Sequence, residues 1–148
     1  PKMWRHFFKP RMANFIAELK AINPQVKVAY HSHGNIYPII PDLIEIGLDV
    51  LNPVQISAAR MDPRYLKDTC GNRLAFWGGG VSTQTTLPFG SPAQVAEEVA
   101  RTTAIFARGG GFVFATDQNI QPSVPVENIL AMGESFGTAR VQAAGAGG

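Results

Sequence analysis

The stretch LAFWGGGVSTQTTLPFGSPAQVAEEV, Leu74–Val99, holds a strand, a glycine-rich turn and the start of a helix, and this order decides the fold. Leu74–Gly79 is apolar without polar alternation, which is typical of a strand buried on both faces of a parallel sheet. Ser91 and Pro92 then supply an N-cap and a first-turn proline, and an apolar face repeats at helical spacing as far as Gly109. The stretch therefore predicts one strand-and-helix unit.

The same pattern recurs along the rest of the chain. Three other apolar runs predict strands: Val26–Tyr30, Asp49–Pro53 and Gly111–Thr116. Four further segments carry apolar residues at helical spacing: Trp4–Ile22, Pro38–Ile46, Pro63–Thr69 and Pro125–Phe136. Short connections between alternating strands and helices predict parallel strands joined by right-handed crossovers. The chain is thus expected to contain one helix followed by four strand–helix units.

Two architectures fit this order, a doubly wound sheet or part of a (β/α)₈ barrel. No Gly-x-Gly-x-x-Gly follows the first strand, so the nucleotide-binding doubly wound sheet lacks its main signal. A complete barrel takes about 250 residues, and a half-barrel alone would leave two strand edges unpaired. We therefore expect residues 1–137 to form the C-terminal half of a (β/α)₈ barrel, followed by a flexible tail over residues 138–148. The N-terminal half of the barrel, which would be its partner, is expected outside this sequence.

Composition excludes several classes of function. The net charge is +2 and no basic run is present, which argues against a nucleic-acid-binding protein. No apolar stretch approaches the roughly 20 residues of a membrane helix. Cys70 is the single cysteine, so an internal disulfide is impossible and a reducing, cytoplasmic location is expected.

Polar residues gather where the predicted strands end. Because the carboxyl ends of parallel strands carry the active site in such folds, these residues are the candidates for binding a substrate. The candidates for substrate binding are Tyr30, Asn52, Gln55, Gly79, Gln84 and Asn119. Gly79 belongs to a run of three glycines that either offers backbone amides to a ligand or forms a tight turn.

His31 and His33 stand two residues apart after the first predicted strand, so both imidazoles can face the same side of an extended segment. Imidazole suits zinc, and a catalytic zinc site takes about three protein ligands. Asp117, after the last strand, is the candidate for the third. The alternatives are that one histidine caps the strand while the other faces solvent, and that Asp117 caps a helix or turn.

Three other residues carry reactive or charged side chains that could have a role in the site. Cys70 lies in a helix-to-strand connection at the opposite rim, which favours a structural thiol. Arg60 and Arg64 flank the loop after the second strand, where each could bind a carboxylate or phosphate or simply be solvated.

Four motifs in one register give the chain a family resemblance. The motifs are HSHGNI, LIEIGLDVLNPVQ, LAFWGGGVSTQTTLPFGSPAQVAEEV and NIQPSVPVENILAM. Together they resemble the C-terminal half of the uroporphyrinogen decarboxylase superfamily. This resemblance implies a (β/α)₈ barrel with its active site at the carboxyl ends of the strands.

The superfamily has two main functional branches. One removes carboxylates from uroporphyrinogen III, in porphyrin biosynthesis, without a cofactor. The other comprises zinc-dependent methyltransferases, some of which act on corrinoid (cobalamin-type) proteins and coenzyme M. Its members carry a His-x-Cys or similar pair where this chain has His31 and His33, so the resemblance favours the methyltransferase branch. Gln118 stands where methyltransferases usually have Cys and decarboxylases have His, which makes Asp117 and Gln118 the candidate catalytic residues.

Three functions are therefore expected, in order of preference. The first is a zinc-dependent, methyltransferase-like enzyme with His31, His33 and Asp117 as metal ligands, acting on a methylated small molecule or a corrinoid partner protein. The second is a cofactor-independent uroporphyrinogen decarboxylase, a lyase. The third is a non-catalytic barrel that binds a tetrapyrrole or corrinoid, a reading motivated by Gln118.

Overall fold

The computed structural model describes residues 1–145 and shows a parallel sheet of four strands in the order β1-β2-β3-β4. The strands are β1 (Ala29–His31), β2 (Val50–Asn52), β3 (Ala75–Trp77) and β4 (Phe112–Val113). Strand order equals chain order, as expected when right-handed crossovers build a barrel one unit at a time. The predicted architecture, four βα units that make half of a (β/α)₈ barrel, is confirmed.

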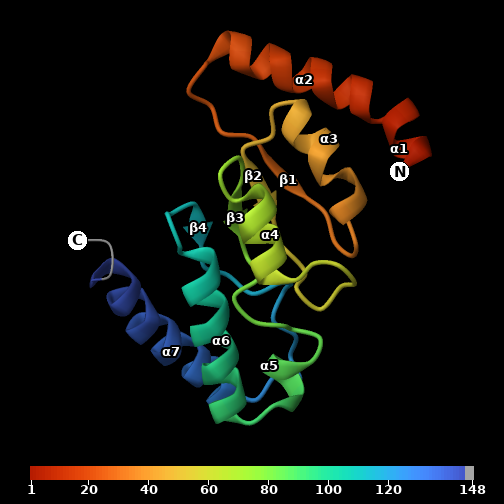
Figure 1. Ribbon diagram of the computed structural model, residues 1–148. Helices are drawn as coiled ribbons and strands as arrows, with labels where there is room; N and C mark the ends of the chain where they lie inside the picture. Colours follow the sequence, from red (N-terminus) through yellow and green to blue (C-terminus); the bar gives the residue numbers. More distant parts are fainter. Residues whose placement is uncertain (146–148) are drawn as a thin grey trace.

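Helices cover the outer side of this sheet (Figure 1). Within the described residues they are α1 (Lys2–Phe7), α2 (Lys9–Ile22), α3 (Ile40–Glu45), α4 (Pro63–Cys70), α5 (Thr86–Phe89), α6 (Pro92–Phe106) and α7 (Val126–Gly145), with a 3₁₀ turn η1 (Tyr37–Ile39) before α3. None of them is long and apolar enough to cross a membrane. The helix-start signals act as predicted. The Asp62 side chain accepts a hydrogen bond from the Tyr65 amide, and Ser91 forms a capping box with Gln94.

The core consists of two apolar clusters. The larger one surrounds β2 and β3 and contains Leu51 and Phe76, both fully buried. The smaller one packs α5, α6 and α7 together around residues such as Val95 and Val99. Leu51 and Phe76 point into the larger cluster, so the alternate residues Val50, Ala75 and Trp77 lie on the other side of their strands. In β1 the exposed residues Ala29 and His31 alternate with the half-buried Tyr30.

Three elements differ from the sequence-based expectation. The helix expected over Trp4–Ile22 is divided into α1 and α2 at Phe8, because Pro10 has no amide hydrogen to continue the helical ladder. The short helix α5 was not foreseen, since four residues are too few to show a helical period.

The last helix also differs. Helix α7 continues to Gly145, so residues 138–145 extend a helix rather than form a separate tail, and residues 146–148 lie outside the described residues. The added segment is rich in alanine, which has the highest helix propensity.

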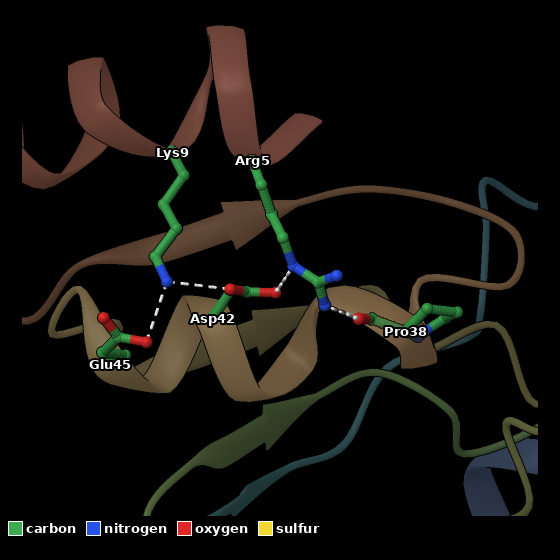
Figure 2. Close-up of polar contacts among 5 residues, drawn as sticks. All are labelled: Arg5, Lys9, Pro38, Asp42 and Glu45. Atoms are coloured by element: carbon green, nitrogen blue, oxygen red, sulfur yellow. Dashed lines mark hydrogen bonds and ion pairs between the residues drawn. The ribbon is translucent and has the colours of Figure 1, made fainter. Parts of the chain in front are cut away.

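Ion pairs attach the N-terminal helices to α3 (Figure 2). Asp42 of α3 accepts hydrogen bonds from Arg5 Nε and Lys9 Nζ, each 2.8 Å long, and Lys9 also reaches Glu45. The Asp42 side chain is 10% exposed, whereas that of Arg5 is 49% exposed. The hydrogen bond from Lys9, assisted by Arg5, holds the pKa of Asp42 below its ordinary value of 3.8, although partial burial opposes this shift.

Replacing Asp42 is expected to loosen this attachment. Asp42→Asn removes two charge-assisted hydrogen bonds from a nearly buried acceptor and should lower the free energy of unfolding by about 2 kcal/mol. Urea denaturation of the full-length protein measures the change. Asp68→Asn is the matched control, because Asp68 forms its ion pair with Arg108 where both side chains are more than half exposed. Such a pair contributes about 0–1 kcal/mol, so equal losses in the two variants would contradict the prediction.

The same network predicts acid sensitivity. Because the folded-state pKa of Asp42 is depressed, its stabilising contribution is complete above pH 3.8 and is lost as the pH falls through the folded-state pKa. The difference in unfolding free energy between the protein and Asp42→Asn should therefore be constant near neutral pH and shrink below the ordinary carboxyl pKa. Urea titrations across this range give the measurement. A difference that grows on acidification would contradict the assignment.

Candidate active site

The register between β1 and β2 places His31 opposite Asn52 at the carboxyl edge of the sheet. His31 Nδ1 and Asn52 Oδ1 are 2.6 Å apart, and Asn52 Nδ2 donates to the Trp77 carbonyl at 2.9 Å. Because that carbonyl can only accept, the amide must turn its oxygen toward His31. His31 therefore carries its proton on Nδ1, and its Nε2 lone pair is directed away from Asn52.

His33 and Gln118 extend this group from two separate segments. The His31 Nε2 and His33 Nε2 atoms are 2.9 Å apart. Gln118 Nε2 lies 3.0 Å from His33 Nε2 and 3.3 Å from His33 Nδ1, and Gln118 Oε1 accepts from the Asn119 amide. The contact joins residues 85 positions apart in the sequence.

Because His31 Nδ1–H already donates to Asn52, a hydrogen bond between the two facing Nε2 atoms requires one proton on either of them. The Gln118 amide nitrogen is nearer to His33 Nε2 than to His33 Nδ1, and it can donate only to the one of these two nitrogens that carries no proton. If a metal ion replaced the proton between the facing Nε2 atoms, the Nε2 atoms of both histidines would be directed toward it. The geometry therefore supports either proton transfer or metal binding.

Gln55 shapes the turn that presents His33. Its side-chain oxygen accepts from the Gly34 amide at 2.8 Å. Gly34 has a φ of +77°, a conformation that glycine adopts without the steric penalty of a side chain. The structure therefore places Gln55 as a support for the histidine loop.

Asp117 does not join the histidines. It is fully buried, and its Oδ1 accepts from the Thr83 amide at 2.8 Å and from the Thr83 hydroxyl at 2.7 Å. Within residues 1–145, no group of three His, Cys, Asp or Glu side chains is placed to hold a metal ion. His31, His33 and Asp117 consequently do not form the three-ligand set expected from the sequence. Asp117 and Gln118 lie in a bend after β4, where the Asp117 carboxylate is turned toward Thr83 and the Gln118 amide toward His33.

The glycine run forms a tight turn rather than an open cradle. An ideal Cβ on Gly79 would lie 3.0 Å from the Val54 carbonyl oxygen, and one on Gly78 would lie 2.0 Å from that of Pro53. Both glycines have positive φ values. Their backbone is therefore packed against the loop that follows β2.

The remaining substrate-binding candidates occupy different surroundings. Tyr30 is half-buried and packs against the larger apolar cluster. Gln84 is exposed, and its backbone amide donates to Ser82. Asn119 is exposed and meets Gln118 through its backbone amide. Sequence reasoning missed the Trp77 carbonyl, because a backbone acceptor leaves no signal in a sequence.

The family model described as "Uroporphyrinogen decarboxylase (URO-D)" matches residues 1–138. A solved structure of a methyltransferase from Methanosarcina mazei is similar, with a TM-score of 0.67 and 25% sequence identity. The match covers 93% of this chain and 37% of that chain, so this chain spans little more than a third of the methyltransferase. No curated protein was found to match the sequence.

Proposed function

The chain belongs to the uroporphyrinogen decarboxylase (URO-D) family, and from this premise we propose that it forms the C-terminal half of an enzyme that transfers a methyl group to or from a thiol or a corrinoid protein. The observation that carries the proposal is the pair of facing imidazole Nε2 atoms at the carboxyl edge of the sheet. The similarity to a methyltransferase structure supports it. The methyl donor, the acceptor and a corrinoid partner are parts of this proposal.

The two imidazole nitrogens suit zinc, but they are fewer than the three protein ligands of a catalytic zinc site. Two imidazole nitrogens are good zinc ligands, and their facing lone pairs can converge on one ion. A Gln118 amide turned to present its oxygen would be a weaker third ligand. We propose that His31 and His33 hold zinc, and that the remaining ligands come from Gln118, the substrate or the other half of the barrel. When bound, zinc would lower the pKa of a coordinated thiol and make it a thiolate nucleophile.

The chain's own residues prepare this site. Asn52 fixes the proton of His31 on Nδ1, which leaves Nε2 unprotonated and directed toward His33. The proton between the two Nε2 atoms must leave, or the His33 ring must turn, before both nitrogens can bind one cation. Binding of a metal at the pair is therefore coupled to loss of a proton, and the affinity should fall as the pH falls. Gln118 limits the rotation of the His33 ring through its side-chain amide.

The test uses the full-length protein, purified with and without added zinc. Zinc content is measured after extensive dialysis, and methyl transfer is followed with methylcobalamin as the donor and coenzyme M as the acceptor. The proposal expects bound zinc and zinc-dependent transfer. A protein that holds no zinc and transfers no methyl group would overturn it.

A second candidate function is decarboxylation of a porphyrinogen, and one observation favours it. The side chains from Gln118 to Asn52 are within hydrogen-bond distance of one another without a metal between them, which suits a cofactor-independent enzyme. Carbon dioxide release from uroporphyrinogen III in the presence of a zinc chelator would establish this function. Binding of a tetrapyrrole without turnover of either substrate would instead favour a non-catalytic barrel.

Removing the support of His31 should weaken the site without removing a ligand. Asn52→Ala deletes the acceptor that fixes the tautomer of His31, and loss of such a partner lowers metal affinity about 10- to 100-fold. A competition titration of zinc against a chromophoric chelator measures the affinity. Asn35→Ala is the control, because Asn35 is exposed on the neighbouring loop. Equal affinities in Asn52→Ala and the unaltered protein would show that Asn52 does not orient His31.

A further inference from the structure

Three arginines line one hollow on the helix side of the molecule. Arg60 comes from the loop after β2, Arg64 from the first turn of α4, and Arg101 from α6. The hollow has a volume of about 450 Å³ and includes the side chains of Ser57, Thr85 and Thr86. A volume of this size is typical of a small-molecule site.

None of these arginines forms an ion pair within 4.0 Å among the residues that the structure describes. Two carboxylates also line the hollow, and both accept hydrogen bonds from backbone amides. Glu98 Oε1 accepts from the Ser82 amide at 3.1 Å, and Asp62 Oδ1 accepts from the Tyr65 amide at 2.9 Å. Three arginines line the hollow together with two carboxylates, so its lining carries one net positive charge.

Arg60 is held in place rather than free. Its φ is +63°, which is costly for a residue with a side chain. Its guanidinium carbon lies 4.6 Å from the centre of the Tyr37 ring, in a cation–π contact. The Tyr37 hydroxyl is in turn hydrogen-bonded to the Tyr65 hydroxyl of α4. Backbone strain that is retained in this way is a marker of functional positions.

The hollow continues into a second one along α5 and α6. The second hollow, of about 410 Å³, shares Thr85, Thr86, Glu98 and Arg101 with the first. Phe89, whose side chain is 83% exposed, lies at its far end. Glu97 also lines the second hollow, so a ligand with its anionic group among the arginines has room there for an uncharged body that points toward Phe89.

We propose that this arginine hollow binds the phosphate group of a phosphorylated small molecule. Arginine presents a planar fork of N–H donors that matches phosphate oxygens bidentately, and the threonine and serine hydroxyls can complete the contacts. The site is separate from the histidine group, with which it shares no residue. Its lining comes from consecutive units in the middle of the sheet, away from the edge strands β1 and β4. It does not depend on the proposed methyl transfer.

The test is isothermal titration of the full-length protein with inorganic pyrophosphate at constant ionic strength. We expect saturable binding of one pyrophosphate per chain, and Arg60→Gln and Arg101→Gln should each weaken it about 10-fold or more. Arg11→Gln, an exposed arginine of α2 remote from the hollow, should leave the affinity unchanged. Both hollow variants replace exposed side chains, and thermal melting of each confirms that it is folded.

Three results would overturn the proposal. The first is the absence of saturable pyrophosphate binding at millimolar concentration. The second is an equal loss of affinity in Arg11→Gln, which would mean that only general surface charge attracts the anion. The third is tighter binding of citrate than of pyrophosphate under the same conditions, which would assign the hollow to carboxylates.

Discussion

His33→Ala is expected to lower the affinity of the full-length protein for zinc about 1,000-fold, because loss of a direct ligand should exceed the 10- to 100-fold cost of losing a residue that orients a ligand. His31 would remain as the single strong ligand from this chain, and Gln118 would lose the ring that its amide contacts. Methyl transfer should fall with the metal. Chelator competition measures the affinity, and the methylcobalamin assay measures the transfer.

His6→Ala is the matched control, since His6 is the third histidine of the chain and lies in α1, against Phe7. It should change neither zinc affinity nor transfer. His31 and His33 are both exposed in this chain, so the loss in His33→Ala is not expected to reflect unfolding. If zinc affinity survives in His33→Ala while His31→Ala abolishes it, the metal is bound without His33, and the paired-imidazole geometry is not the metal site.

The sequence predicted the sheet and the position of the histidines because both depend on local patterns. Apolar runs marked the four strands, and parallel order followed from the short helical connections. The first strand is shifted, however, from Val26–Tyr30 to Ala29–His31. The shift has a clear cause, since His31 pairs with Asn52 in the ladder and a polar residue within a strand interrupts the apolar run that marks it.

The sequence could not show which of the adjacent residues Asp117 and Gln118 lies beside the histidines, because a shift of one residue in the backbone exchanges the directions of their side chains. Asp117 and Gln118 follow a strand of only two residues, and the side on which each one emerges is set by the backbone after β4. The Asp117 amide donates to the Val81 carbonyl. This hydrogen bond holds the backbone so that the Asp117 carboxylate points toward Thr83. A carboxylate is a better metal ligand than an amide, which is why the sequence favoured Asp117. In the structure Gln118 lies beside His33 instead.

Gly78→Ala is expected to destabilise the protein by about 4 kcal/mol or more, because two penalties act at the same position. Gly78 has a φ of +113°, and an added Cβ would lie 2.0 Å from the Pro53 carbonyl oxygen. A methyl group cannot occupy that space unless β3 moves away from the loop after β2. Urea denaturation, or the soluble yield if the variant does not fold, measures the effect.

Substitutions at two other glycines measure the cost of the positive φ apart from the cost of the steric contact. Gly109 also has a positive φ, of +66°, but has nothing within 4 Å of an added Cβ, so Gly109→Ala should cost only about 1 kcal/mol. Gly133 lies inside α7 with open space around it, so Gly133→Ala should stabilise the helix by up to about 1 kcal/mol. A loss in Gly78→Ala no larger than that in Gly109→Ala would mean that the contact with Pro53 is not tight.

The consequence of Gly78→Ala should extend to the histidines. The Trp77 carbonyl, which precedes Gly78, accepts the amide hydrogen of Asn52, and Asn52 fixes the tautomer of His31. A displacement of β3 from the loop after β2 would stretch this hydrogen bond. Any folded fraction of Gly78→Ala should therefore bind zinc more weakly, as Asn52→Ala does, whereas Gly109→Ala should keep the full affinity. The close packing of Gly78 against Pro53 would then be required for the histidine site as well as for the fold.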